Sequence, residues 1–349
     1  MAYTTVNDPS IYFQSLLYTG NSSTQSVTFN GNSNLQPDLV WTKCRSNTSD
    51  HFLFDTNRGV HKNIHSNDTA AEVTNSNSLT SFDSDGFSMG TVGGMNFNSQ
   101  TYVGWGWKAN GGTTASNSNG TITSTVQANT AAGFSIISYT GNGSDGATIG
   151  HGLNATPEVF FPKCLSTTTN WEMYFFPPGG TKQYGYLNLT NGFSTWSHTA
   201  PTTTTIGLSG SGDSNGNGRT MIGYAFHSVK GYSKIGTYIG NGSTSGNFIN
   251  TGFKPAFVLT KQTTTASDTY QWGIRDSVRT PANPANKALY PNGTNVENDH
   301  GTNNMYFNSN GFMPSTANSH TNGNGMGYFY MAFAESPFVS SAGVPTTAR

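Results

Sequence analysis

The amino-acid sequence predicts an all-β protein made of three tandem β-sandwich, jelly-roll-like repeats of about 100 residues each. Thr, Gly, Asn and Ser supply 169 of the 349 residues, and clusters of them separate short apolar runs of strand length. The chain also has 22 Phe, 16 Tyr and 6 Trp, whose large side chains can fill a core although aliphatic residues are few. No long segment has apolar residues at the helical spacing i, i+3, i+4, i+7, so we expect almost no helix.

Three sequence markers occur in the same order three times. The first is a tyrosine that ends an apolar run and begins a turn: Tyr18-Thr19-Gly20-Asn21, Tyr139-Thr140-Gly141-Asn142 and Tyr238-Ile239-Gly240-Asn241. The second begins 17 to 19 residues later with a proline and ends on a lysine: Pro37–Lys43, Pro157–Lys163 and Pro255–Lys261. The third is an aromatic strand: Tyr102–Trp107, Met221–Phe226 and Tyr328–Phe333. Composition alone does not produce the pattern Pro-x-apolar-apolar-x-x-Lys, so the markers indicate an internal repeat.

The markers set the expected boundaries. We expect repeat 1 at 11–108, repeat 2 at 133–231 and repeat 3 at 232–338, with an N-terminal arm at 1–10 and a C-terminal arm at 339–349. Between the first two repeats lies segment 109–132, which is rich in Gly, Ser, Thr and Asn and which we interpret as a linker. The alternative for this segment is an edge strand that includes Ile122 and Val126.

Large apolar residues also alternate after each lysine strand, as Phe52 and Phe54, Trp171 and Met173, and Tyr270 and Trp272 do. This period of two predicts one buried face of the next strand, and core is favoured over a sugar-stacking role for these tryptophans. Cys44 and Cys164 follow the repeated lysine at equivalent positions. Equivalent positions of successive domains are usually far apart, so we expect two reduced, buried thiols rather than a disulfide.

Charge excludes several function classes. Only 9% of residues are charged, and the 16 basic residues nearly balance the 17 acidic ones. A nucleic-acid-binding protein needs a basic patch, and this balance of charge argues against one. No segment has the ~20 apolar residues of a membrane span, and the first residues do not resemble a secretory signal. We therefore expect no nucleic-acid partner and no membrane insertion.

The search for catalytic and metal-binding residues gives only weak candidates. The segment from Asp213 to Gly218 matches the first half of a calcium-binding loop, with Asp213, Asn215 and Asn217 as ligands. Tyr224 stands where the bidentate glutamate is required, so a hairpin turn is favoured. The sequence predicts no catalytic residue and no cofactor.

Two further groups of polar residues also have a plain structural interpretation. His61 and His65 have the spacing of metal ligands on a helix, but no helix and no third ligand are evident, so a loop is predicted. Asp83 and Asp85 form a pair of carboxylates that we interpret as a turn, because Asn308-Ser309-Asn310-Gly311 keeps the turn in repeat 3 without them. A carboxylate pair for glycoside hydrolysis can also come from distant parts of a sequence.

The repeat markers resemble structural and fibre-like proteins of tailed bacteriophages that infect marine bacteria and cyanobacteria. The resemblance extends from about residue 8 to 338 and includes the following segments: Asp8 to Trp41, Gly120-Thr121-Ile122-Thr123-Ser124, His151-Gly152-Leu153 and Met331-Ala332-Phe333-Ala334-Glu335-Ser336-Pro337-Phe338. It implies a location on the virion surface after assembly in the bacterial cytoplasm. It supplies no catalytic residues. The insertion at Ala282–Gly301 and the replacement of the cysteine by Gln262 set repeat 3 apart.

The sequence thus predicts a non-enzymatic structural protein of the virion, either a capsid decoration or fibre protein or a tail-associated component. We expect contacts with other capsid or tail proteins and a homo-oligomer, with a trimer as the specific prediction. The alternative is a tail-fibre adhesin that binds host-surface glycan, with Trp196 and Tyr290 as the candidate stacking residues. A glycan-degrading tailspike is the third hypothesis.

Overall fold

Short antiparallel strands build almost the whole chain, which confirms the all-β prediction. The structure is a computed structural model and describes residues 4, 6–264, 270–299 and 304–336. Within these ranges there are 28 strands and two single-turn helices, the 3-10 helix η1 (Pro9–Ile11) and α1 (Gly93–Asn96). No helix in this part of the chain has the length and apolar character that a membrane crossing requires.

Three large sheets form the framework. Large sheet I has the order β1 (Phe13–Thr19), β9 (Thr101–Trp107), β3 (Leu39–Cys44), β4 (His51–Asp55), β5 (Lys62–His65), β6 (Val73–Thr74). Large sheet II has the order β10 (Ala115–Asn117), β11 (Ser124–Asn129), β12 (Phe134–Thr140), β19 (Thr220–Phe226), β14 (Val159–Cys164), β15 (Glu172–Phe175), β16 (Gln183–Tyr186), β17 (Ser194–Thr195). Large sheet III has the order β20 (Ser233–Ile239), β28 (Gly327–Phe333), β22 (Phe257–Gln262), β23 (Gly273–Asp276).

The same four-strand order occurs in each large sheet. It is β1-β9-β3-β4 in sheet I, β12-β19-β14-β15 in sheet II and β20-β28-β22-β23 in sheet III. The tyrosine marker lies on the first of these strands, the aromatic marker on the second and the lysine marker on the third. The register also agrees, since Lys43, Lys163 and Lys261 lie opposite Val103, Ile222 and Phe329.

A small sheet packs on the outer face of each large sheet. The small sheets have the orders β2 (Gln25–Val27), β8 (Gly86–Met89), β7 (Leu79–Asp83); β13 (Thr148–Gly150), β18 (Thr205–Gly207); and β21 (Ile249–Asn250), β27 (Gly311–Ser315), β26 (Asn304–Asn308). A further pair, β24 (Lys287–Ala288) and β25 (Asn298–Asp299), lies next to large sheet III. Separate apolar cores fill the space between each large sheet and its small sheet. We call these two-layer units lobes I, II and III.

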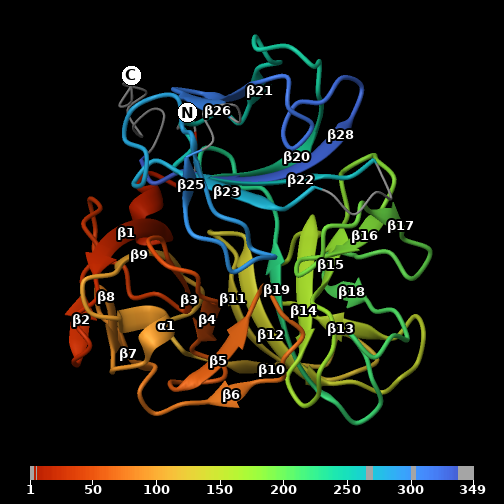
Figure 1. Cartoon of the computed structure of the whole chain (residues 1–349). Helices are drawn as coiled ribbons and strands as arrows, with labels where there is room; N and C mark the ends of the chain where they lie inside the picture. The colour runs from red at the N-terminus through yellow and green to blue at the C-terminus, as the bar shows by residue number, and fades with distance from the viewer. Residues whose placement is uncertain (1–3, 5, 265–269, 300–303, 337–349) are drawn as a thin grey trace.

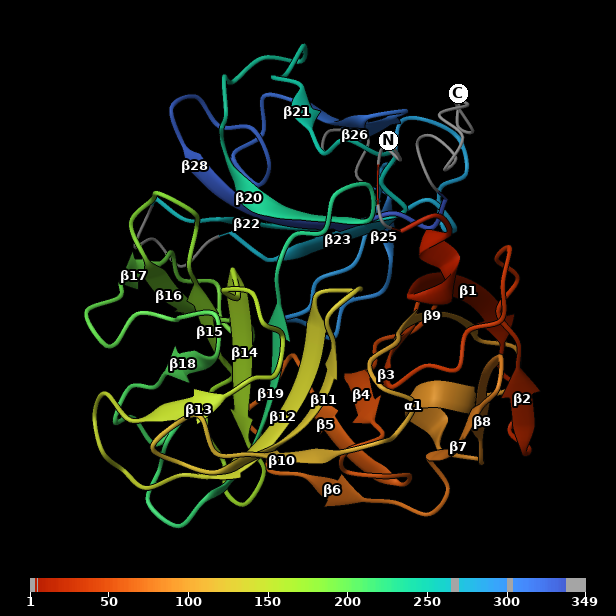
Figure 2. The same cartoon turned by 180° about the vertical axis from the view of Figure 1, so that it is seen from behind.

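The inner faces of the three large sheets meet in one shared core (Figure 1, Figure 2). Equivalent aromatic residues from the second strand of each sheet meet there. The ring centroid of Phe333 lies 5.7 Å from that of Trp107 and 5.8 Å from that of Phe226. Our expectation of separate tandem domains therefore needs correction, because each large sheet is buried on both faces and the lobes share a core.

The linker interpretation of 109–132 and the N-terminal arm also need correction, whereas the alternative of a strand in this segment is confirmed for Val126. Segment 109–132 contains β10 and β11, and β11 pairs with β12 along six residues. Asp38 fixes the start of this segment, since its carboxylate accepts the backbone N–H groups of residues 109, 111 and 112. At the N-terminus, Val6 is buried in the shared core and Asp8 caps η1. The predicted C-terminal arm, 339–349, lies outside the described residues.

Buried lysines join the lobes in cyclic order. Each repeated lysine is fully buried, and its Nζ donates to a threonine carbonyl in a neighbouring lobe. The three bonds are Lys43 to Thr294 at 3.3 Å, Lys163 to Thr69 at 3.2 Å, and Lys261 to Thr190 at 2.9 Å. Lobe I therefore contacts lobe III, lobe II contacts lobe I, and lobe III contacts lobe II through the same type of bond.

The acceptor loops share the sequence Asn-x-Thr. The asparagine Oδ1 of each loop accepts a backbone N–H at the start of the adjacent strand in its own lobe. These bonds are His51 N to Asn67, Trp171 N to Asn188 and Trp272 N to Asn292. The asparagine thus fixes the loop within its lobe, and the threonine carbonyl two residues later receives the lysine of the neighbouring lobe.

A second set of polar contacts follows the same cyclic order. Asp55, at the end of β4, pairs with Arg58 and accepts a hydrogen bond from Tyr224 of lobe II at 2.7 Å. At the equivalent position of β23, Asp276 pairs with Arg279 and accepts from the Trp105 indole of lobe I at 3.0 Å. The polar donor and the buried charge are therefore present together at two of the three joints between lobes.

At the third joint both partners are apolar. The position of Asp55 is occupied by Phe175 in lobe II, and the position of Tyr224 by Met331 in lobe III. Both side chains belong to the shared core. Donor and acceptor are lost as a pair, which avoids the cost of a buried carboxylate without a partner.

The buried lysines make stability depend on pH. Burial lowers the pKa of Lys43 and Lys163 to about 8 and that of Lys261 to about 7. Since a lysine in an unfolded chain titrates near ~10.4, the folded protein binds fewer protons between roughly pH 7 and 10. The free energy of unfolding should therefore rise with pH across this window. Above about pH 10, buried tyrosines such as Tyr224, whose pKa is raised by burial, should reverse the trend.

Urea unfolding at a series of pH values between 7 and 10 measures this slope. In Lys163→Met, the slope of the free energy of unfolding against pH should decrease by up to about 1.4 kcal/mol per pH unit, which is the contribution of one proton. The control is Lys182→Met, at a half-buried lysine that is not one of the three repeated lysines. An unchanged slope in Lys163→Met would contradict the assignment.

Candidate functional site

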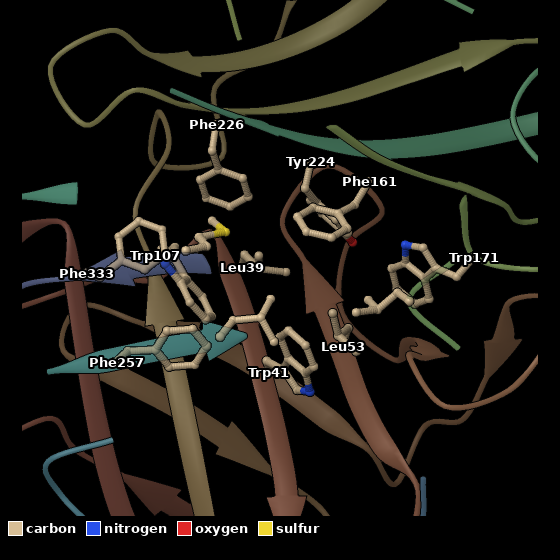
Figure 3. A pocket seen from close by; sticks show the side chains of 13 residues that line it. Leu39, Trp41, Leu53, Trp107, Phe161, Trp171, Tyr224, Phe226, Phe257 and Phe333 are labelled. Carbon is tan, nitrogen blue, oxygen red and sulfur yellow. The ribbon is translucent and has the colours of Figure 1, made fainter. Parts of the chain in front are cut away.

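The hollow at the centre of the shared core is a packing void (Figure 3). Its volume is about 40 Å³, and its 13 lining side chains, from all three large sheets, present no polar surface to it. Trp107, Phe226, Phe257 and Phe333 point toward one another around it (Figure 3). A water molecule would need two or more polar partners, which this hollow does not offer. The void therefore belongs to the framework.

A second hollow, of about 280 Å³, combines aromatic rings with polar groups on the outside of lobe II. We call it the lobe II pocket. It lies beside β15 and β16, and loops from the ends of β17 and β18 and the loop before β13 complete it. Its lining residues are Asp145, Glu172, Tyr184, Tyr186, Trp196, His198, Ser209, Gly210 and Ser211.

Aromatic side chains form one wall of the lobe II pocket. Tyr184 and Tyr186 lie on the same face of β16, with ring centroids 6.2 Å apart and planes nearly perpendicular. Trp196 packs between Tyr174 at 4.1 Å and His198 at 4.7 Å, and its indole N–H donates to the Thr199 carbonyl. These contacts hold the tryptophan in place, and it lines the pocket although only 6% of its surface is exposed.

Glu172 supplies a buried carboxyl group to the pocket. It is 3% exposed, and its Oε2 accepts hydrogen bonds from the hydroxyls of Tyr174 at 3.0 Å and Ser211 at 3.2 Å. Burial raises its pKa above the ordinary glutamate value, although these hydroxyls oppose the shift. Burial likewise raises the pKa of Tyr186, its partner on β16, to about 12.

Asp145 supplies the second carboxyl group, and this one is open to solvent. Its Oδ1 lies 2.5 Å from Nδ1 of His198, and 65% of the Asp145 side chain is exposed against 26% of the histidine. The pocket therefore has one buried and one exposed carboxyl group beside an aromatic wall. Such a combination of a few polar groups with aromatic surface is typical of small-ligand sites.

The polar character of the pocket is specific to lobe II. Glu172 occupies the position of Phe52 in lobe I and of Gly273 in lobe III, as the pairing of the neighbouring strands shows. A carboxylate within an otherwise apolar strand was a signal available in the sequence. Glu172, Asp145, Tyr184, Tyr186 and His198 were not among the residues predicted from the sequence. Of the predicted glycan-binding residues, Trp196 lies in the pocket.

Tyr290 lies elsewhere and is 9% exposed. It lies near the buried Arg275 and does not line the lobe II pocket. Trp171 and Trp272 are fully buried in the shared core, as predicted for core residues. Phe52 and Phe54 are buried too, but they face the small sheet of lobe I, because the alternation there is offset by one residue.

The predicted cation ligands are divided between different roles. Asn215 is buried, and its side chain accepts the backbone N–H of Asn142 at 2.9 Å and donates to the carbonyl of Ser144 at 2.9 Å. Asp213 accepts the backbone N–H of Asn170 at 3.0 Å, and Asn217 is exposed. The structure therefore does not direct these three side chains to a common point, and the hairpin-turn interpretation is the better one.

The role of Asn215 occurs in all three lobes. Equivalent asparagines accept the backbone N–H of the asparagine in the tyrosine marker and donate to the carbonyl two residues later. The three clamps are Asn96 on Asn21 and Ser23, Asn215 on Asn142 and Ser144, and Asn322 on Asn241 and Ser243. Beside each clamp, the marker tyrosine donates its hydroxyl to the residue before the asparagine.

Among the described residues, one group of side chains has ligand atoms close enough for a metal ion: Asp50, His65 and Asp68. His65 ends strand β5, which corrects the loop prediction, and His61 is not part of the group. The carboxylates of Asp83 and Asp85 belong to the β7–β8 hairpin, and Asp85 accepts the Leu35 backbone N–H at 3.0 Å. Cys44 and Cys164 are free and buried, as predicted.

Comparison with known proteins gives a family without an assigned function. The chain belongs to the family described as Domain of unknown function (DUF7483), whose model matches residues 8–337. No curated protein and no solved structure matches the chain.

The clamp predicts the effect of changing Asn215. In Asn215→Ala, the backbone N–H of Asn142 and the carbonyl of Ser144 lose their partners, so the free energy of unfolding should fall by about 1–3 kcal/mol. Asn217→Ala, two residues away and exposed, should change it by less than about 0.5 kcal/mol. Urea unfolding of both variants, with and without calcium, checks this. A calcium-dependent loss in both would instead support a cation loop.

Proposed function

We propose that this chain is a non-enzymatic structural protein on the surface of a tailed-phage virion and that its lobe II pocket binds a host-surface glycan. The first part rests on the resemblance of the repeat markers to fibre-like virion proteins. The second part rests on one observation: Trp196, Tyr184 and Tyr186 form an aromatic wall beside the carboxyl groups of Glu172 and Asp145. A sugar ring has an apolar C–H face and a rim of hydroxyl groups, and the pocket offers a partner for each.

The framework supports a role outside the cell. Its three lobes share one core and are joined by buried polar contacts, so the protein should open slowly and resist proteolysis. Its few charges and many Asn, Ser and Thr side chains give a neutral surface that can form hydrogen bonds with a protein lattice or with sugars. We propose contacts with capsid or tail proteins and a homotrimer, without a nucleic-acid partner. Cryo-electron microscopy of intact particles distinguishes a capsid location from a tail location.

The charge of the pocket indicates which sugars it accepts. Its lining contains two carboxyl groups and one histidine, and no lysine or arginine. Neutral hexoses and amino sugars can donate hydrogen bonds to these groups, whereas a uronic or sialic acid would place a third carboxylate beside them. We therefore propose neutral or amino sugars as ligands.

Glycoside hydrolysis is a second candidate function, because two carboxyl groups line the same pocket. Burial raises the pKa of Glu172, which is the direction that a general acid requires, and the exposed Asp145 would take the role of base or nucleophile. Asp145 is already paired with His198, so we favour binding. Release of reducing sugar, with its loss in Glu172→Gln, would favour hydrolysis.

A glycan array with purified bacterial surface polysaccharides tests the binding proposal. Trp196→Ala and Asp145→Ala should each weaken binding about tenfold or more, since each removes a wall of the pocket. Trp196 is buried, so circular dichroism must show that this variant folds; Asp145 is mostly exposed, and its variant should fold normally. Phe248→Ala, at an exposed aromatic residue of lobe III, is the matched control and should bind as the native chain does.

Two results would count against the proposal. Failure of the native chain to bind any neutral or amino sugar would remove the glycan function and leave the structural role alone. Equal loss of binding in Phe248→Ala would place the binding surface elsewhere.

A further inference from the structure

We infer that Asp50, His65 and Asp68 of lobe I form a zinc-binding site. The three ligand atoms lie within 4.8 Å of one another, and Nδ1 of His65 is 3.0 Å from Asp68 Oδ2 and 3.8 Å from Asp50 Oδ2. Zinc bonds of about 2.0–2.2 Å in tetrahedral geometry place neighbouring ligand atoms roughly 3.3–3.6 Å apart. The observed separations lie on both sides of this value, so small side-chain movements complete three zinc bonds.

Backbone and side-chain contacts already aim the carboxylates at one point. Oδ1 of Asp50 accepts the Asn67 amide at 2.8 Å, and Oδ1 of Asp68 accepts the Ala70 backbone N–H at 2.9 Å. The other oxygen of each carboxylate faces His65. Hydrogen bonds of this kind orient metal ligands and hold them in place before the ion arrives.

The ligand set favours zinc and leaves a position for water. One imidazole and two carboxylates match the nitrogen and oxygen ligands of zinc, whereas calcium takes six to eight oxygen ligands. The side chains of Asp50 and Asp68 are 39% and 34% exposed, and that of His65 is 14% exposed. Solvent therefore reaches the carboxylates, and the fourth position of the ion would hold water.

The fold does not depend on these residues. Lobes II and III keep the asparagine of the loop, as Asn188 and Asn292, with the same hydrogen bond as Asn67. The candidate ligands, however, are replaced by residues that cannot form the site: Asn170, Tyr186 and Leu189 in lobe II, and Gln271 and Gly293 in lobe III. The loop is thus structural in all three lobes, and the ligand set is an addition to lobe I.

Zinc at this site would strengthen the joint between lobes I and II. Asp68 directly precedes Thr69, whose carbonyl accepts both Lys163 Nζ and the Thr169 backbone N–H of lobe II. An ion that fixes Asp68 therefore fixes the acceptor of these two contacts. The inference does not rest on the proposed glycan function, because the lobe II pocket shares no residue with this site.

Isothermal titration of the full chain, after removal of metals by chelator, tests the site with zinc chloride. We expect one zinc ion per native chain and at least tenfold weaker binding in His65→Ala and in Asp68→Asn. At a zinc concentration of about ten times Kd, the melting temperature of the native chain should rise by roughly 2 °C. Cobalt in place of zinc should give the visible absorption of a four- or five-coordinate ion.

The control is His198→Ala, which removes the other paired histidine described in lobe II but leaves Asp50, His65 and Asp68 intact. It should bind zinc as the native chain does. If His65→Ala fails to fold, Asp50→Asn and Asp68→Asn decide the question. The inference is overturned if the native chain binds no zinc, or if the ligand variants bind it as tightly as the native chain. In that case His65 only shares a hydrogen bond with Asp68.

Discussion

Burial of each large sheet on both faces is the constraint on which the rest of this structure depends. The outer face packs on a small sheet, and the inner face meets the other two large sheets in the shared core. A lobe alone would therefore expose an apolar inner face that includes large aromatic rings, such as that of Trp107 or Phe226. At roughly 25 cal/mol per Å² of apolar area, this exposure would be costly, so the three lobes should fold and unfold as one body. Large aromatic rings lie on both faces of the sheets, and they fill the cores although the chain has few aliphatic residues.

Apolar packing alone does not fix how three similar sheets are rotated around a common centre. The buried polar contacts do so, because each donor has its acceptor in only one neighbouring lobe. The lysine–threonine bond occurs at all three joints, and the aspartate–aromatic bond at two of them. Each ammonium group also donates to a carbonyl of its own lobe, so a lobe placed with the wrong rotation would remove one of its two carbonyl partners and leave part of a buried charge unsatisfied. We interpret these groups as determinants of the arrangement, and the substitution of Phe175 and Met331 at the third joint shows that one apolar joint is tolerated.

The sequence predicts the framework well and the joints poorly. Strand positions follow from periodicity and markers, since Gly and Asn turns interrupt runs such as Phe134–Tyr139 at strand length. The shared core was not predicted, because strands buried on both faces lose the alternation that would show which face is inner. The linker interpretation of 109–132 failed for a related reason: its composition is that of a flexible segment, but Asp38, 71 residues from Ala109, holds its start. Asp50 and Asp68 of the proposed zinc site and Asp145 of the lobe II pocket were missed because only the fold brings these loop residues to their partners, whereas Glu172 stands out in the sequence as a carboxylate in an apolar strand.

The comparison of equivalent positions separates structural polar residues from functional ones. Asn96, Asn215 and Asn322 form the same clamp in three lobes, so their conservation within this chain is explained by the turn that they hold. Glu172 and His65 differ, since each is replaced by a residue of another type where the same backbone occurs in another lobe. A polar group that the scaffold does not need, placed where its burial raises the free energy of the folded state, requires another reason to be present. Because the three lobes share one backbone plan, polar residues that break the repeat, such as Glu172 and His65, are the ones through which we propose that this protein binds other molecules.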